Sequence, residues 1–79
     1  MAREIRKAEF ERLFKKYDIV LVPAKGSHFK LKGTVGGKTV TYPVPTIGGR
    51  TIREIYVREA RKRFRLLPQD GVPDEEFFA

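Results

Sequence analysis

The sequence predicts an α+β fold in which two helices cover one face of a three-stranded antiparallel sheet, in the order helix, strand, strand, strand, helix. Two observations carry this prediction. Long segments near the two ends have apolar residues at helical spacing, and the short segments between them have the β-branched or alternating composition of strands. Because each helix has one apolar stripe to bury, both are expected on the same face of the sheet, and the other face stays open.

The chain has 79 residues, which is close to the lower limit at which one hydrophobic core stabilises a fold. We therefore expect a single domain over residues 1–79, with residues 68–79 as an acidic C-terminal tail. There is no Cys for a disulfide or a thiolate metal site, and no apolar run has the length of a signal core or a membrane span. These features favour a cytoplasmic protein without a membrane partner.

The first helix is expected from Arg3 to Tyr17. Its apolar residues recur at intervals close to those of one helical face, and charged residues fill the gaps between them. These apolar residues are Ile5, Ala8, Phe10, Leu13, Phe14 and Tyr17.

The first two strands are expected over residues 19–22 and 28–32. The first is a short run rich in β-branched residues, and Pro23 ends it. A turn follows at residues 25–27. The second strand alternates polar and apolar residues, as a strand with one solvent-exposed face does.

The third strand is expected over residues 38–42. Gly36 and Gly37 separate it from the second strand, which predicts a hairpin with a loop longer than two residues. Pro43 and Pro45 are expected to end the strand.

The second helix is expected to begin at Thr51 as its N-cap and to stop at Pro68. Its apolar side is formed by Ile52, Ile55, Tyr56, Ala60, Phe64 and Leu67. Its other side carries basic residues offset only by Glu54 and Glu59, and we call these basic residues the cationic strip: Arg50, Arg53, Arg58, Arg61, Lys62, Arg63 and Arg65. The expected core anchors are Phe10, Phe14, Tyr56 and Phe64.

The acidic tail contains one more structural signal. Asp74 is expected to cap a short helical turn, and Phe77 and Phe78 are expected to dock on the body of the domain.

Charge is distributed unevenly along the chain. The formal net charge is +7, and residues 1–67 carry seventeen Lys and Arg against six Asp and Glu, a balance of +11. A surface with this excess attracts polyanions, so a nucleic-acid backbone is the favoured partner and we expect RNA. The alternative is that the charge serves only solubility.

The single histidine of the chain lies in a basic setting. Because alternate residues of a strand share a face, we expect His28, Lys30 and Lys32 to project together. Nearby positive charge favours a neutral imidazole, which is the form that a general base needs. On this spacing alone, an ordinary surface residue is the favoured interpretation of His28. One His without Cys or clustered carboxylates cannot complete a metal site, so neither a metal nor another cofactor is expected.

Several short motifs occur in order along the chain. Gly26-Ser27-His28-Phe29-Lys30 is preceded by the apolar run of residues 19–22 and followed by Val40-Thr41-Tyr42-Pro43, by Gly49-Arg50-Thr51-Ile52-Arg53-Glu54-Ile55, and by a Gly71-Val72-Pro73-Asp74-Glu75-Glu76-Phe77 ending. In these motifs the chain resembles the HicA family of toxins, which are small mRNA interferases with a double-stranded-RNA-binding-like αβββα fold. The resemblance covers nearly the whole chain.

The resemblance implies a toxin of a type II toxin–antitoxin system that cleaves mRNA without a metal. His28 takes the position of the family's catalytic histidine, and the implied partner besides RNA is a HicB-type antitoxin; DNA is not expected as a primary substrate. Cationic side chains bind the phosphates of an RNA backbone. The expected RNA-binding residues are Lys25, Ser27, Lys30, Lys32, Lys38, Arg50 and Arg53.

Three positions differ from the family pattern. Phe29 stands where many members have a second histidine, and Val44-Pro45 stands where another histidine is common. Tyr17-Asp18 replaces a glycine-containing turn. Two alternatives to a nuclease therefore stay open: a non-catalytic RNA-binding module of the same fold, and an interaction protein whose basic face meets an acidic protein.

Overall fold

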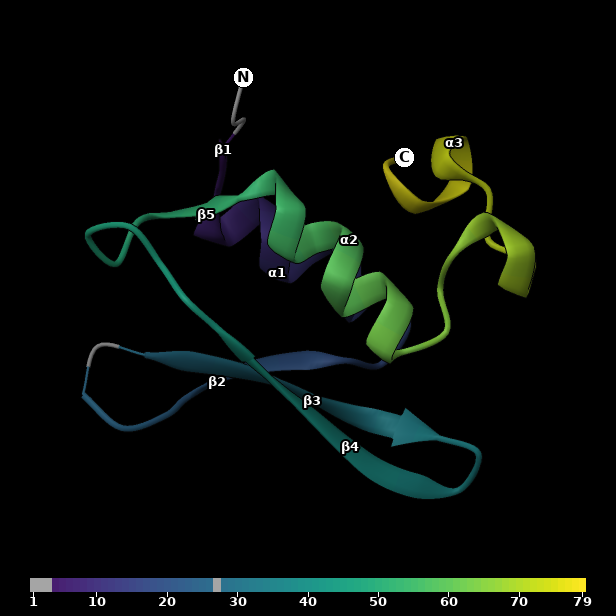
Figure 1. Ribbon diagram of the computed structural model, residues 1–79, viewed down its shortest axis with the longest axis horizontal. Coiled ribbons are helices and arrows are strands. Elements are labelled where there is room, and N and C mark those ends of the chain that lie inside the picture. Colours follow the sequence, from purple (N-terminus) through teal and green to yellow (C-terminus); the bar gives the residue numbers. More distant parts are fainter. Residues whose placement is uncertain (1–3, 27) are drawn as a thin grey trace.

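The computed structural model describes residues 4–26 and 28–79 of the chain (Figure 1). Its elements follow in the order β1 (Glu4–Arg6), α1 (Lys7–Lys15), β2 (Val20–Pro23), β3 (Phe29–Val35), β4 (Lys38–Val44), β5 (Thr51–Arg53), α2 (Glu54–Arg63), a 3₁₀ turn η1 (Pro68–Asp70) and α3 (Asp74–Phe77).

Strands β2, β3 and β4 form an antiparallel sheet with β3 in the middle, and α1 and α2 lie over the same face of it (Figure 1). The register pairs Leu31 of β3 with Leu21 on one side and Tyr42 on the other. Leu31 is completely buried, so this face meets the helices. The α+β class and the three-stranded antiparallel sheet are confirmed.

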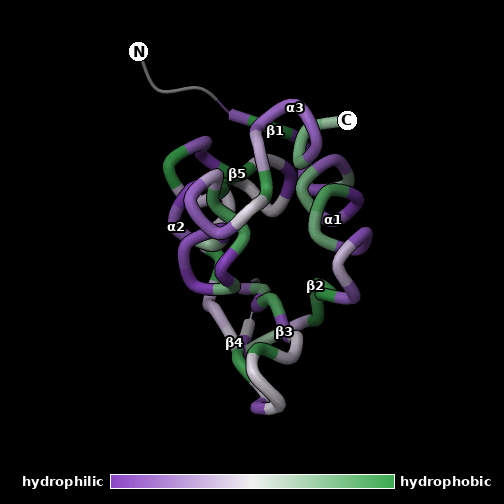
Figure 2. The backbone as a smooth tube through the Cα atoms, turned by 90° about the vertical axis from the view of Figure 1, so that its right-hand side faces the viewer, coloured by the Kyte–Doolittle hydropathy of each residue, from purple (hydrophilic) through white to green (hydrophobic). Residues whose placement is uncertain are grey.

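The core lies between the sheet and the helices. Phe10, Phe14 and Phe64 are buried as expected, and Tyr56 is half-buried at its edge. Hydrophobic and hydrophilic stretches alternate along the helices, as Figure 2 shows. Gly33 lies against this core, and a Cβ atom built there would come within 2.8 Å of Cγ1 of Ile19. The glycine therefore allows β3 to lie close to Ile19, the residue before β2.

The hairpin between β3 and β4 differs from the prediction, because its loop has only two residues. Val35 pairs directly with Lys38, and Gly36 and Gly37 have φ values of +59° and +79°. Positive φ at both positions is the requirement of the two-residue type I′ turn, whose twist matches that of the strands. The strand β4 also continues through Pro43 to Val44, because β4 is an edge strand and proline is tolerated there.

Both helices begin later than the sequence predicts, because a short strand precedes each. Strands β1 and β5 pair antiparallel, with Ile5 opposite Ile52, and α1 and α2 begin at the next residues. Thr51 is thus a strand residue rather than an N-cap, and its hydroxyl donates to Oε1 of Glu4 at 2.9 Å. The helix α2 ends at Arg63, before Pro68, and Arg65 has a φ of +56°.

The turn between α1 and β2 needs a residue in the left-handed conformation. Asp18 has a φ of +60° there. Glycine adopts this region most readily, and aspartate is one of the few other residues that enter it at modest cost. Aspartate therefore forms this turn without a glycine.

Residues 68–79 fold back onto the body of the domain. Phe77 is completely buried, with its ring centre 5.2 Å from that of Phe14 and stacked 5.9 Å from that of Tyr17. Phe78 remains 48% exposed, so only one of the two expected phenylalanines docks. Asp74 does not cap α3, because Pro73 is the N-cap and the Asp74 carboxylate accepts a hydrogen bond from Arg61 at 2.7 Å.

No helix in the part of the chain that the structure describes is long and apolar enough to cross a bilayer.

Candidate nucleic-acid interface

His28 lies in the tight turn between β2 and β3. Its carbonyl accepts a hydrogen bond from the Ala24 N–H at 2.9 Å, and its own N–H donates to the Lys25 carbonyl at 3.2 Å. Strand β3 begins at Phe29, one residue later than predicted, and the His28 side chain is exposed. The backbone bonds fix the turn while the imidazole stays accessible to a large substrate. Ser27, also an expected RNA contact, lies outside the described residues.

Lys30 and Lys32 lie on the face of the sheet that the helices leave uncovered. Both alternate with buried Leu31, and their cross-strand neighbours include Val22 beside Lys30 and Thr41 beside Lys32. In antiparallel strands, directly opposite residues share a face. The two ammonium groups therefore share a surface with valine and threonine side chains.

This sheet and its flanking loops contain no acidic residue. Between residues 19 and 53 there is neither Asp nor Glu, although the segment carries six Lys and Arg: Lys25, Lys30, Lys32, Lys38, Arg50 and Arg53. All ten acidic residues lie in residues 4–18 and 54–76. The positive charge of the sheet is thus not offset by carboxylates on its own strands, which favours an anionic ligand there.

A further lysine, which the sequence did not single out, lies beside the start of β3. The Lys7 ammonium is 4.0 Å from the ring centre of Phe29, a cation–π geometry. The Lys7 N–H also donates to the Arg50 carbonyl at 2.8 Å, which ties the loop before β5 to the first turn of α1. The turn of His28 and the loop of Arg50 consequently lie at the same end of the molecule (Figure 1).

Nothing in the sequence could have identified the contact of Lys7. It joins residues 22 positions apart, and Lys7 looks like any other charged position of a helix. The ring of Phe29, the residue after His28, thus holds the Lys7 ammonium at the start of β3.

Lys38 lies away from this end. It begins β4 opposite Val35, at the far end of β3 from Phe29. Six steps along a strand, at about 3.3 Å each, separate the two ends by about 20 Å. Lys38 and His28 cannot contact the same phosphate, although an extended strand of RNA would reach both.

The cationic strip on α2 is smaller than predicted. Arg61 is only 4% exposed, and its guanidinium donates to the Leu66 and Val72 carbonyls and to Asp74. Ile55 is 63% exposed, although its spacing placed it on the apolar side. The basic residues that remain exposed within and just after α2 are Arg58, Lys62, Arg63 and Arg65.

One flank of α2 faces the edge strand β4. A hollow of about 390 Å³ there is lined by Tyr42, Glu59, Lys62 and Arg63. Burial raises the pKa of the Tyr42 hydroxyl, and the nearby Glu59 carboxylate and Tyr56 raise it further. Tyr42 therefore stays neutral, and able to donate a hydrogen bond, at physiological pH.

Two further pKa shifts occur on α1 and in the turn after it, away from the hollow beside β4. Hydrogen bonds from Arg12, at 2.7 and 3.0 Å, lower the pKa of Glu9. In the turn after this helix, burial raises the pKa of Tyr17, and the Glu76 carboxylate adds to the effect. These shifts belong to the contact between α1 and the C-terminal segment and do not involve His28.

Metal ligands are not grouped in the described residues: nowhere in them do three or more His, Asp or Glu side chains form a possible metal site.

Comparison of the chain with protein-family models, with curated proteins and with solved structures gives no match.

Proposed function

We propose that the protein is a metal-independent endoribonuclease of the HicA toxin type, with His28 as its catalytic residue. One observation carries the proposal: the only histidine of the chain is exposed in a hydrogen-bonded turn, at one end of a sheet segment without acidic residues. Lys7, Lys25 and Arg50 belong to the same end. The proposed function also rests on the resemblance of the sequence motifs.

RNA carries its own nucleophile, so this site needs few groups. The His28 imidazole takes the proton of a ribose 2′-hydroxyl, whose oxygen forms a bond to the adjacent phosphorus. The bond from phosphorus to the 5′-oxygen breaks, and that oxygen takes a proton from the imidazolium or from water. The products are a 2′,3′-cyclic phosphate and a 5′-hydroxyl end.

Negative charge grows on the phosphate oxygens during this reaction, and lysines near His28 are suited to stabilise it. Lys25 and Lys30 are close to His28 in the chain, and Lys7 is held over the ring of the next residue. In this proposal Lys7 supplies positive charge beside Phe29, the position at which many members of the family have a second histidine.

The remaining expected contacts bind the RNA on either side of the cleaved bond. Lys32 and then Lys38 continue along the sheet, and Arg50 and Arg53 continue through the loop and β5. Messenger RNA is the proposed substrate in the cytoplasm, and an acidic HicB-type antitoxin is the proposed inhibitor, matched to the net charge of +7.

The test is to incubate the purified protein in EDTA with labelled single-stranded RNA, beside the His28→Ala and Lys38→Ala variants, and to measure cleavage and gel retardation. We expect His28→Ala to slow cleavage by about two to four decades, the usual contribution of a general base, with RNA binding retained. Lys38→Ala, about 20 Å away along the strand, should weaken binding without that loss of rate.

Two other results would replace the proposal. RNA binding with no cleavage by the wild-type protein would indicate the non-catalytic RNA-binding module. Neither binding nor cleavage would indicate a protein whose basic surface meets an acidic protein partner instead.

A further inference from the structure

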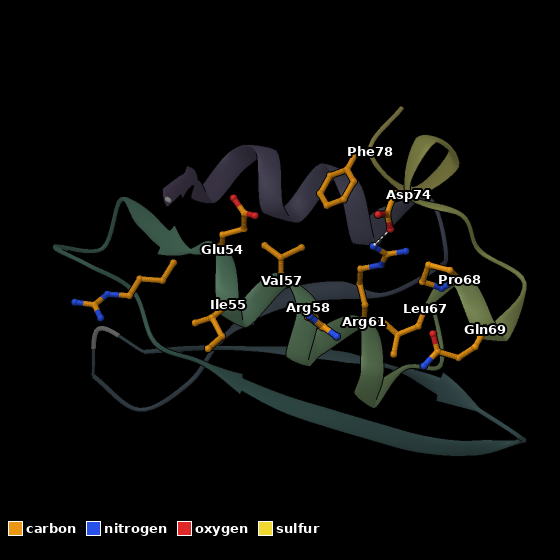
Figure 3. A pocket seen from close by; sticks show the side chains of 11 residues that line it. Glu54, Ile55, Val57, Arg58, Arg61, Leu67, Pro68, Gln69, Asp74 and Phe78 are labelled. Carbon is orange, nitrogen blue, oxygen red and sulfur yellow. Dashed lines mark hydrogen bonds and ion pairs between the residues drawn. The ribbon is translucent and has the colours of Figure 1, made fainter. Parts of the chain in front are cut away.

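A groove on the helical side of the molecule contains none of the residues proposed to act at the cleaved phosphate, and Arg53 is the one proposed RNA contact among its lining residues. It has a volume of about 960 Å³ and lies between α2 and the C-terminal segment (Figure 3). Arg53, Val57 and Arg58 line it from the end of β5 and from α2, and Leu67 and Pro68 line it from the chain that follows. None of the residues that line it belongs to the turn of His28 or to the sheet β2–β3–β4.

Two exposed apolar side chains border this groove. In the described residues four large apolar side chains are markedly exposed, and Ile55, at 63%, and Phe78, at 48%, are the two most exposed. Both line the groove, one from α2 and the other from the residue after α3 (Figure 3). Isolated apolar residues on a surface need no explanation, but two that line one hollow give it exposed apolar surface of the kind found at interaction sites.

The groove is lined by Glu54 and Asp74 as well as by three arginines, of which Arg53 and Arg58 are suited to the carboxylates of a ligand. Arg53 and Arg58 are exposed, and within the described part of the chain neither has an ion pair or a side-chain hydrogen bond. Arg61, in contrast, is satisfied by Asp74 and two carbonyls inside the fold. Guanidinium groups bind carboxylates through two parallel hydrogen bonds, so Arg53 and Arg58 favour an acidic ligand.

We propose that this groove binds a short acidic segment of a partner protein, with one or two apolar side chains between Ile55 and Phe78 and carboxylates on Arg53 and Arg58. A second copy of the chain fits poorly, because each copy carries a net charge of +7. RNA fits less well than a peptide, because Phe78 is the one aromatic ring of the lining, and the exposed Ile55 and the half-buried Leu67 offer aliphatic surface that does not stack bases. The proposal does not depend on whether His28 is catalytic.

The test uses a random peptide library displayed on phage, selected on the wild-type protein and counter-selected on the Ile55→Glu variant. We expect enrichment of peptides that combine Asp or Glu with Leu or Phe. A synthetic copy of an enriched peptide is then titrated by fluorescence anisotropy. Ile55→Glu and Arg58→Glu should each weaken its binding by about tenfold or more, which is the effect of losing one central contact of an interface.

Two matched controls separate the groove from general electrostatic attraction. Arg63→Glu changes the net charge as much as Arg58→Glu does, but Arg63 lies on the flank of α2 that faces β4. Val20→Glu places the same new carboxylate on β2, at another exposed apolar position. Both should leave peptide affinity within about twofold, since exposed residues outside an interface contribute little.

Three results would overturn the proposal. The first is that the phage selection enriches no acidic peptides. The second is that Arg63→Glu weakens peptide binding as much as Arg58→Glu does. The third is that a groove variant loses affinity for RNA while its affinity for the peptide is unchanged. Circular dichroism of each variant checks that the fold is kept. RNA cleavage by Arg58→Glu reports separately on the proposed nuclease, so that failure of one proposal is distinct from failure of the other.

Discussion

Arg61 illustrates how a charged residue in a helical pattern can be part of the core. Its Nε donates to the Leu66 carbonyl at 2.9 Å, and its two terminal nitrogens donate to Asp74 at 2.7 Å and to the Val72 carbonyl at 2.9 Å. Its guanidinium carbon also lies 4.4 Å from the ring centre of Phe77. One buried side chain therefore joins α2 to the segment that follows it.

Replacing Arg61 by methionine keeps an apolar stem and removes these hydrogen bonds. Two backbone carbonyls and a partly exposed carboxylate then lose their donor, and buried groups without partners cost about 1–3 kcal/mol each. We expect the free energy of unfolding, measured by urea titration, to fall by about 3 kcal/mol. The exposed neighbour Lys62, changed to methionine, should alter it by less than about 0.5 kcal/mol. Equal effects of the two changes would show that the Arg61 contacts contribute little.

The residues of the candidate site were predictable to different extents. The alternation around Leu31 was enough to place Lys30 and Lys32 on one face, because the period of a strand is a local property. The cation–π contact of Lys7 and its bond to the Arg50 carbonyl join residues 22 and 43 positions apart. Only the fold brings such residues together, so no local pattern indicates them.

Among the elements, the paired strands β1 and β5 were the main feature that sequence patterns did not reveal. Each has only three residues, and their partners are 45 to 49 positions apart. Glu4–Arg6 continues the charged and apolar spacing of α1, so the pattern reads as one helix from the start. The longer helices and strands were predictable because apolar periodicity extends over enough residues to define them.

The two-residue hairpin gives a prediction at the level of an element. Gly36 has a φ of +59°, and left-handed backbone costs most non-glycine residues about 1–2 kcal/mol, whereas asparagine adopts it readily. Gly36→Val should therefore lower the free energy of unfolding by about 1–2 kcal/mol, and Gly36→Asn should leave it nearly unchanged. Thermal and urea unfolding of the two variants check this. If both unfold alike, backbone conformation does not determine the choice of glycine.

At the scale of the whole molecule, acidic and basic residues occupy different parts of the fold. The sheet and its loops are free of carboxylates between residues 19 and 53, while the acids lie in β1, on the two main helices, in the turn after α1 and in the C-terminal segment. Part of that segment is held by cations: the Lys16 ammonium donates to the Glu76, Phe77 and Ala79 carbonyls at 3.0, 2.7 and 3.2 Å. The fold thus separates a basic surface with His28 from a helical surface of mixed charge.

The central claim is that His28 activates a ribose 2′-hydroxyl, and one substitution in the substrate tests it most directly. After the cleaved bond is mapped on an all-RNA oligonucleotide, the same oligonucleotide is made with a single 2′-deoxyribose on the 5′ side of that bond. We predict that the wild-type protein binds both oligonucleotides equally in EDTA but does not cleave the deoxy-substituted bond, because the nucleophile is missing. Cleavage of that bond at an unchanged rate would mean that another nucleophile attacks the phosphate, and it would contradict the proposed mechanism.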